Sequence, residues 1–258
     1  MLAKRIIPCL DIKNNKIVKG IKFKNHKIIS ENILSIVNRY MLEGADELVF
    51  YDILAYTENK LANKNLVYKI SRILNIPFCV AGGIRSVEDA NKILSNGADK
   101  ISINSPAIDN PNLISLLANK FGKQCVVVGI DSFFNKKLNK YFVFKYTGDS
   151  KKIVNTNLYT YDWVKKVQEL GAGEIVLNVI NFDGLNLGYD IKQLKKIRKI
   201  CRVPLIASSG AGSYKHFYDV FKNANVDGAL AASVFHNKKI HIKKLKNFLF
   251  KKGIEVRL

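Results

Sequence analysis

Two aspartates at the ends of similar apolar segments could carry out acid–base chemistry. Asp11 closes the segment Arg5-Ile-Ile-Pro-Cys-Leu-Asp11, and Asp131 closes Cys125-Val-Val-Val-Gly-Ile-Asp131. They lie 120 residues apart, close to half of the 258-residue chain. A carboxylate at the carboxyl end of a barrel strand lies at the mouth, where parallel barrels carry out their chemistry. Two such groups facing each other can give a proton to a substrate and take one from it.

Glycine-rich segments at the ends of other strand-like runs suggest phosphate binding. Two of these segments, 81–84 and 208–212, contain adjacent small residues, and Asn104-Ser105 and Ala232-Ser233 end two further runs. One such segment alone often makes only a tight turn. Backbone N–H groups at the start of a helix bind phosphate, and in barrels this usually happens after strands seven and eight. Two equivalent sites would suit a long substrate with a phosphate at each end.

The two halves of the chain repeat the same segments in the same order. Gly44 to Phe50 resembles Gly171 to Leu177, and Pro77 to Gly83 resembles Pro204 to Gly210, both at an offset of 127 residues. Such a repeat argues for eight strands built from two homologous halves. Eight Val-, Ile- and Leu-rich runs are typical of buried parallel strands: 5–11, 47–53, 77–81, 100–104, 125–131, 174–180, 204–208 and 228–232. The sequence therefore predicts a single domain over residues 1–258, a (β/α)8 TIM barrel made of two repeated half-barrels.

Helical periodicity is predicted between the strands. Ser86 is a good N-cap for a helix over 86–94, and the segment 241–252 predicts a basic amphipathic helix with its lysines in solvent. The segment 30–42 predicts a helix whose inward stripe consists of Ile33, Leu34, Val37 and Met41.

Two connections are longer than a barrel needs, and both follow the strands that end in an aspartate. The segment 14–30 is expected to be a long loop, whereas alternation in Lys140 to Tyr146, within the connection 132–157, predicts a surface hairpin. Long ordered connections at this place are more often functional than accidental. We therefore expect both to cover the mouth of the barrel.

The charge of the chain is strongly positive. Forty-two basic and 21 acidic residues give a net charge of +21. Such a field attracts anionic substrates and binds nucleic acid weakly. The lysines are scattered along the chain and no recognition motif accompanies them, so we expect no specific nucleic-acid partner.

Cysteine and histidine usage argues against disulfides and metals. The four cysteines, Cys9, Cys79, Cys125 and Cys201, lie 46 or more residues apart, which favours reduced thiols in a cytoplasmic protein. The four histidines do not stand at matching strand ends, so no metal site and no cofactor are expected. No apolar run approaches the length of a membrane span, and no secretion signal is recognised.

Several segments taken together resemble one known family. They are Arg5 to Asp11, Val80 to Ile84, Gly97 to Pro106, Gly129 to Asp131, Gly171 to Leu177 and Ala231 to His236. They are similar to the HisF family, the cyclase subunits of imidazole glycerol phosphate synthase in histidine biosynthesis. The similarity includes the C-terminal segment from Gly253 to Arg257. The resemblance implies a lyase that takes ammonia and the bisphosphorylated substrate PRFAR. It would form imidazole glycerol phosphate and release aminoimidazole carboxamide ribotide (AICAR).

The resemblance also implies roles for individual residues. Asp11 and Asp131 would be the catalytic acid–base pair, and Lys19 would contact the substrate when its loop closes. From the residues alone, Lys19 could equally be an ordinary surface lysine. The phosphate contacts would come from Gly83 and Asn104 at one site, and at the other from Asp183, Gly184, Gly210, Ala232 and Ser233.

Four charged residues stand just before apolar strands, at the end opposite the expected chemistry. They are Arg5, Glu47, Lys100 and Glu174. Two positive and two negative charges can pair in a ring, which offsets part of their burial cost. The resemblance implies that this ring gates ammonia arriving from a glutaminase subunit docked at the N-terminal face in a heterodimer. From the residues alone, solvent-exposed charges are the simpler interpretation.

The chain departs from the family pattern at a few positions. Ser209 replaces the first glycine of the usual Ser-Gly-Gly, and it would be strained if that position requires a positive φ. Phe182 and Leu185 flank Asp183-Gly184 where polar residues are common, and Leu54-Ala-Tyr56 replaces a frequent Thr-Ala-Ser. These changes bear on affinity more than on the reaction.

Three alternative functions remain open at this point. The sibling isomerase that forms PRFAR shares the half-barrel repeat and the bisphosphorylated substrate but uses no ammonia. The charged ring and the Cys-Leu-Asp ending of the first strand argue against it. A paralogous cyclase for surface sugars would be expected to alter Asp11, which this chain keeps. A basic nucleic-acid-binding module would show steep salt dependence and sequence preference.

Overall fold

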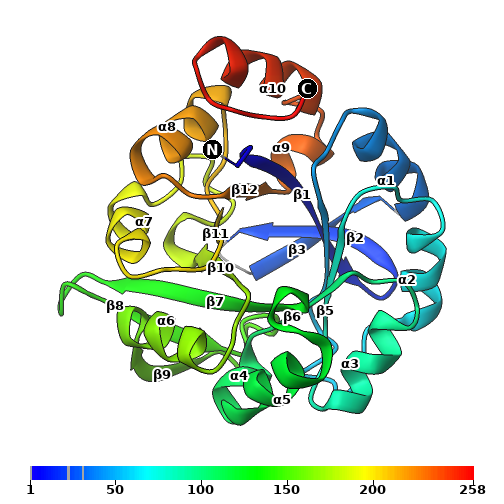
Figure 1. Cartoon of the computed structure of the whole chain (residues 1–258), viewed down its shortest axis with the longest axis vertical. Coiled ribbons are helices and arrows are strands. Elements are labelled where there is room, and N and C mark those ends of the chain that lie inside the picture. Colours follow the sequence, from blue (N-terminus) through cyan, green and yellow to red (C-terminus); the bar gives the residue numbers. More distant parts are fainter. Residues whose placement is uncertain (1, 22–23, 31) are drawn as a thin grey trace.

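The barrel predicted from the repeat is present in the computed structural model, which describes residues 2–21, 24–30 and 32–258, without the side chains of 24–26. The barrel strands are β1 (Arg5–Lys13), β4 (Leu48–Asp52), β5 (Phe78–Ala81), β6 (Lys100–Ile103), β7 (Val126–Asn135), β10 (Glu174–Val179), β11 (Leu205–Ser208) and β12 (Gly228–Ala231). Each pairs in parallel with the next, β10 pairs with β7, and β12 pairs with β1. The eight strands therefore close into a ring (Figure 1).

Helices surround this ring (Figure 1). They are α1 (Ile33–Leu42), α2 (Lys64–Ser71), α3 (Val87–Leu94), α4 (Ser105–Asp109), α5 (Asn112–Phe121), α6 (Thr160–Glu169), α7 (Ile191–Arg198), α8 (Tyr214–Ala224), α9 (Ser233–His236) and α10 (Ile242–Lys251), with short 3-10 turns η1 (Lys123–Cys125) and η2 (Ile180–Phe182). One apolar core lies between helices and strands, and a smaller one, including Ile7, Val127 and Ile206, fills the barrel. The parallel strands are thus covered on both faces, as their composition indicates.

Equivalent hydrogen bonds in the two halves agree with the internal repeat. The Asp99 carboxylate accepts from the Phe78 amide at 2.8 Å, and the Asp227 carboxylate accepts from the Leu205 amide at 2.8 Å. A third aspartate, Asp46, accepts from the Ile6 amide at 2.8 Å. In each case an aspartate just before one strand binds the start of the neighbouring strand.

Two hairpin extensions follow the aspartate strands. The hairpin expected in 140–146 is confirmed by β8 (Lys140–Lys145), which pairs with β7 and with β9 (Val154–Tyr159). The expectation of a plain loop over 14–30 is wrong, because β2 (Lys16–Ile21) and β3 (Lys24–Ser30) form an antiparallel hairpin there. β2 also pairs with β1, and Asn14 and Asn15 make the turn between β1 and β2 with φ of 50° and 57°, the conformation that tight hairpin turns require.

Two expectations about helix faces need correction. In α1, Leu34 is 37% exposed and Tyr40 is buried, because the inward face runs through Ile33, Val37 and Tyr40. In α10 the lysine face is not wholly solvated. Lys246 is 4% exposed and pairs with Asp46 at 2.8 Å, so its charge is compensated inside the protein.

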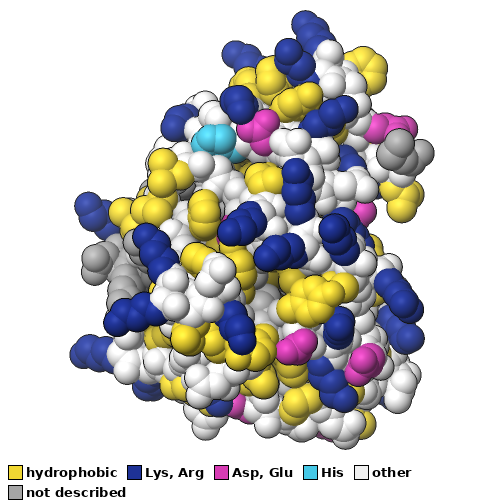
Figure 2. Space-filling model, turned by 90° about the vertical axis from the view of Figure 1, so that its left-hand side faces the viewer, with side chains coloured by type: hydrophobic (Ala, Val, Ile, Leu, Met, Phe, Trp, Pro, Cys, Tyr) yellow, Lys and Arg dark blue, Asp and Glu magenta, His cyan; other side chains and the backbone are white. Residues whose placement is uncertain are grey.

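Lysine and arginine side chains are spread over the face shown in Figure 2 and do not gather into one stripe. This distribution agrees with the scatter of lysines along the sequence. No helix within the described residues is long and apolar enough to span a membrane.

Candidate active site

A pocket opens at the carboxyl ends of the barrel strands. It brings together residues from nearly all parts of the chain. The ten residues predicted to contact substrate all line it: Asp11, Lys19, Gly83, Asn104, Asp131, Asp183, Gly184, Gly210, Ala232 and Ser233. Asp11 and Ser233, 222 positions apart in sequence, thus share one cavity because the parallel strands end at the same side.

Asp11 is held in an ion pair. Lys19 of β2 reaches back to it, with its Nζ 2.9 Å from Asp11 Oδ2 and 3.3 Å from Asp183 Oδ1. Burial would raise the pKa of Asp11, but the Lys19 ammonium outweighs it and holds that pKa below its ordinary value. Lys19 is largely buried, so the interpretation as an ordinary surface lysine is wrong.

Asp131 has a different environment. It is 3% exposed; the Asn178 amide donates to its Oδ1 at 2.8 Å, and the Thr147 hydroxyl donates to its Oδ2. Burial raises the pKa of Asp131, and the hydrogen bonds from Thr147, Asn178 and the Asn104 side chain only partly counter it. The two aspartates are therefore biased in opposite directions, with Asp11 ionised more readily than Asp131.

Both glycine-rich segments depend on glycine for close backbone packing. Gly83 has φ of 69°, and a Cβ there would lie 1.8 Å from the Lys60 carbonyl oxygen. Gly210 has φ of 98°, and a Cβ would lie 2.0 Å from the Gly188 carbonyl oxygen. In both halves of the barrel the segment thus requires a glycine with a positive φ packed against a backbone carbonyl group. α4 and α9, which follow the next strands β6 and β12, both begin without a side-chain cap.

Three pocket residues were missed in the sequence. Asp52 ends β4 just as Asp11 ends a strand-like run, so the same signal could have found it. Asn178 is the polar residue inside the apolar strand β10, which was a second available signal. Thr147 lies in the connection between β8 and β9, and no sequence pattern marks it as a pocket residue. Its contact with Asp131 depends on how that hairpin folds back.

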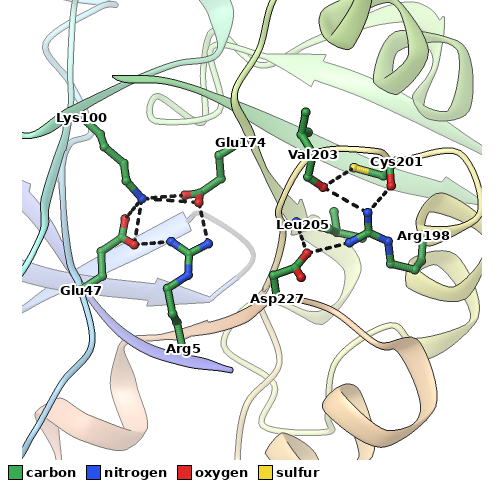
Figure 3. A network of polar contacts seen from close by, with 9 residues as sticks. All are labelled: Arg5, Glu47, Lys100, Glu174, Arg198, Cys201, Val203, Leu205 and Asp227. Carbon is green, nitrogen blue, oxygen red and sulfur yellow. Dashed lines mark hydrogen bonds and ion pairs between the residues drawn. The ribbon is translucent and has the colours of Figure 1, made fainter. Parts of the chain in front are cut away.

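At the opposite end of the barrel the four charged residues form a ring (Figure 3). Arg5 lies 2.5 Å from Glu47 and 2.6 Å from Glu174, while Lys100 lies 2.9 Å from Glu47 and 3.4 Å from Glu174. Glu47 is 1% exposed. The simpler interpretation as solvent-exposed charges is therefore wrong, since each acid contacts both bases.

Comparisons with known proteins agree with this geometry. The family described as "Histidine biosynthesis protein" matches residues 5–241. The chain is 65% identical to "Imidazole glycerol phosphate synthase subunit HisF" of Buchnera aphidicola subsp. Baizongia pistaciae, with all of both chains covered. It is 60% identical to the HisF subunit of Blochmanniella pennsylvanica and 57% identical to that of Proteus mirabilis, again over the full length of both. The chain belongs to the HisF family.

Ser209, where the resemblance led us to expect glycine, adopts a strained backbone conformation. Its φ is 75°, in the region that favours glycine. We expect Ser209→Gly to stabilise the protein by about 1 kcal/mol, because an L side chain at such an angle costs about that much. The thermal midpoint should then rise by about 2–4 °C.

Asn225, which ends α8 with φ of 49°, provides the matched control. Asparagine tolerates this region, so Asn225→Gly should stabilise less than Ser209→Gly. An unchanged or lowered midpoint for Ser209→Gly would show that the serine makes a compensating interaction.

His236 of this HisF chain is buried at the end of α9. Its Nδ1 shares a 2.6 Å hydrogen bond with the Tyr40 hydroxyl, and burial lowers its pKa to about 4. The neutral imidazole therefore stabilises the fold fully above about pH 6.5, its unfolded pKa, and this stability is lost as pH falls toward 4. We expect the free energy of unfolding to fall about 3 kcal/mol more between pH 7 and pH 4 in the natural protein than in His236→Gln. Urea titrations at several pH values would measure this.

Equal pH-dependence curves for His236→Gln and the natural protein would contradict this prediction. Within the described residues, no group of His, Cys, Asp and Glu could hold a metal ion.

Proposed function

We propose that this chain is the ammonia-using cyclase of imidazole glycerol phosphate synthase, a lyase that converts PRFAR to imidazole glycerol phosphate and AICAR. The observation that carries the proposal is one pocket in which two aspartates, Asp131 buried and Asp11 largely buried, have pKa values shifted in opposite directions and are accompanied by two glycine-constrained segments. A substrate with a phosphate at each end would place its reacting centre between Asp11 and Asp131.

The pKa directions suggest how the two aspartates divide the work. Addition of ammonia, cleavage and ring closure each move a proton to or from the substrate. The lowered pKa of Asp11, beside Lys19, favours the carboxylate form, which accepts a proton, whereas the raised pKa of Asp131 favours the protonated form, which donates one. Groups with pKa values pushed apart are a common arrangement for acid–base pairs.

The phosphates would bind at the two glycine segments. Gly83 and Asn104 would hold one, and the uncapped start of α4 adds a backbone donor. The other would bind at Asp183, Gly184, Gly210, Ala232 and Ser233. Lys19 would balance the negative charge of this second phosphate. The Lys19 ammonium would have to turn from Asp183 toward the phosphate to do so.

Ammonia would enter through the charged ring. Between the ring and the pocket the barrel interior is apolar, including Val49, Val127 and Leu230. A neutral molecule crosses such a region far more easily than an ammonium ion, because an unpaired charge is costly to bury. We propose that a glutaminase subunit docks at this N-terminal face as a heterodimer in the cytoplasm and releases ammonia there.

Incubation of the purified chain with PRFAR and an ammonium salt at mildly alkaline pH tests the proposal directly. We expect loss of PRFAR with formation of AICAR, and activity with glutamine only after the glutaminase is added. A folded protein that leaves PRFAR unchanged would overturn the proposal. Conversion of the isomerase substrate to PRFAR would instead identify the sibling enzyme.

A further inference from the structure

Two tyrosines from separate connections converge on one carboxylate at the rim of the pocket. The Tyr56 hydroxyl, from the segment after β4, donates to Asp109 Oδ2 at 2.6 Å. The Tyr146 hydroxyl, from the connection after β8, donates to the same oxygen at 2.9 Å. Lys145 Nζ lies 2.5 Å from Asp109 Oδ1. Asp109, at the end of α4, thus gathers three donors from two other parts of the chain.

The two tyrosine rings also stack on each other. Their centroids are 5.8 Å apart with an interplanar angle of 21°. The Arg85 guanidinium lies 4.7 Å from the centre of the Tyr56 ring and donates to the Tyr56 carbonyl oxygen at 2.6 Å. Tyr56 is therefore fixed from its ring face, its hydroxyl and its backbone. We call Tyr56, Asp109 and Tyr146 the tyrosine clamp.

The clamp holds a backbone conformation that would otherwise be unfavourable. Tyr146 has φ of 59°, which costs about 1–2 kcal/mol for an L residue other than asparagine, aspartate or glycine. Its amide donates to the Ser105 hydroxyl at 2.9 Å. Such a strained conformation persists only where the surrounding contacts impose it.

The residue next to the clamp contacts a proposed catalytic group. The Thr147 hydroxyl donates to Asp131 Oδ2, and Gly148 packs so closely that a Cβ there would lie 1.8 Å from the Ile53 carbonyl oxygen. Asp109 does not line the pocket, whereas Tyr146 and Thr147 do. A change at Asp109 can therefore reach Asp131 through the 146–147 backbone without touching the substrate.

We propose that the tyrosine clamp positions Thr147 against Asp131 and thereby sets the geometry and acidity of that carboxyl during turnover. This inference rests on the proposed role of Asp131. Tyr56, Asp109 and Tyr146 are positioning residues, since the clamp acts through Thr147.

Loss of the clamp should change both rate and pH dependence. Misplacement of a catalytic group by about 1 Å can cost up to about 100-fold, and we expect Asp109→Asn to lower kcat roughly tenfold. The Thr147 hydrogen bond stabilises the Asp131 carboxylate, so its loss raises the pKa of Asp131. The limb of the kcat–pH profile governed by Asp131 should move to higher pH.

A double-mutant cycle tests whether the clamp acts through Thr147. Asp109→Asn should lower kcat in the natural protein. In the Thr147→Val variant it should have little further effect, because the hydrogen bond from residue 147 to Asp131, which the clamp positions, is already absent. Thr147→Ser, which keeps the hydroxyl, should restore sensitivity to Asp109→Asn. Tyr68→Phe, at a 54% exposed tyrosine on α2, is the matched control and should leave kcat unchanged. If the fold losses in kcat caused by Asp109→Asn and Thr147→Val multiply in the double variant, the inference is overturned.

Limited trypsin digestion supplies a measure independent of turnover. Lys151 and Lys152 are exposed in the connection after Tyr146, and Lys152 Nζ contacts the Thr57 carbonyl oxygen at 3.0 Å. Asp109→Asn should speed cleavage at these lysines several-fold. Faster cleavage with an unchanged kcat–pH profile would overturn the positioning role and leave the proposed function intact. Full activity of Asp131→Asn would instead refute the proposed role of Asp131.

Discussion

Replacing Asp131 or Asp11 with asparagine is expected to lower ammonia-dependent turnover of PRFAR by at least about 100-fold, as loss of a general acid or base commonly does. Asparagine has nearly the shape of aspartate but cannot transfer a proton. At position 131 it can still accept from Thr147, so packing should survive. Steady-state kcat with saturating PRFAR and ammonium measures the effect, and a circular dichroism melt shows whether each variant is folded.

The matched control is Asp162→Asn, at an exposed aspartate on α6, which should retain full activity. If both active-site variants lose less than about tenfold in turnover, acid–base catalysis by these residues is rejected. A loss confined to one variant would retain only that aspartate as a proton-transfer group.

Glu47→Gln is expected to reduce the free energy of unfolding by about 3 kcal/mol. Glu47 is buried between Arg5 and Lys100, and its neutralisation leaves two cations to share Glu174. Removing one partner of a buried ion pair typically costs about 3–5 kcal/mol. Because Arg5 and Lys100 are partly exposed, we expect a loss at the lower end of this range. The urea midpoint should fall with an unchanged slope.

Two variants sharpen this test. Glu58→Gln removes the acid of a largely exposed pair with Lys60 and should change stability by less than about 1 kcal/mol. Adding Lys100→Met to Glu47→Gln should recover part of the lost stability, because it removes the cation left in excess. If Glu47→Gln has no larger effect than Glu58→Gln, the ring does not contribute to stability through charge pairing.

The strands could be predicted closely because burial on both faces leaves an uninterrupted apolar run. The segment predicted at 204–208 is β11 at Leu205–Ser208, and the one at 228–232 is β12 at Gly228–Ala231. All ten predicted substrate contacts share the pocket for a related reason. The strand ends of a parallel barrel converge, so sequence position relative to a strand determines position in space.

Contacts made by the hairpins could not be predicted in this way. Nothing in the lysine-rich segment 14–30 distinguishes Lys19 from its neighbours until β2 folds back along β1 and brings Lys19 to Asp11. Thr147 likewise depends on the fold of β8 and β9. Leu34 was misplaced because α1 begins at Ile33 after the Asn32 cap, and the phase of its buried face follows from packing against the barrel.

The aspartates that precede β4, β6 and β12 have a consequence for the geometry of catalysis. Asp46, Asp99 and Asp227 each accept a hydrogen bond from one amide near the start of the neighbouring strand, so they help to fix how far one strand is displaced along its neighbour. In a closed barrel this displacement, the shear, determines strand tilt and barrel diameter. Three hydrogen bonds at the bottom of the molecule therefore help to set the width of its opening, and with it the separation between Asp11 and Asp131 in the pocket.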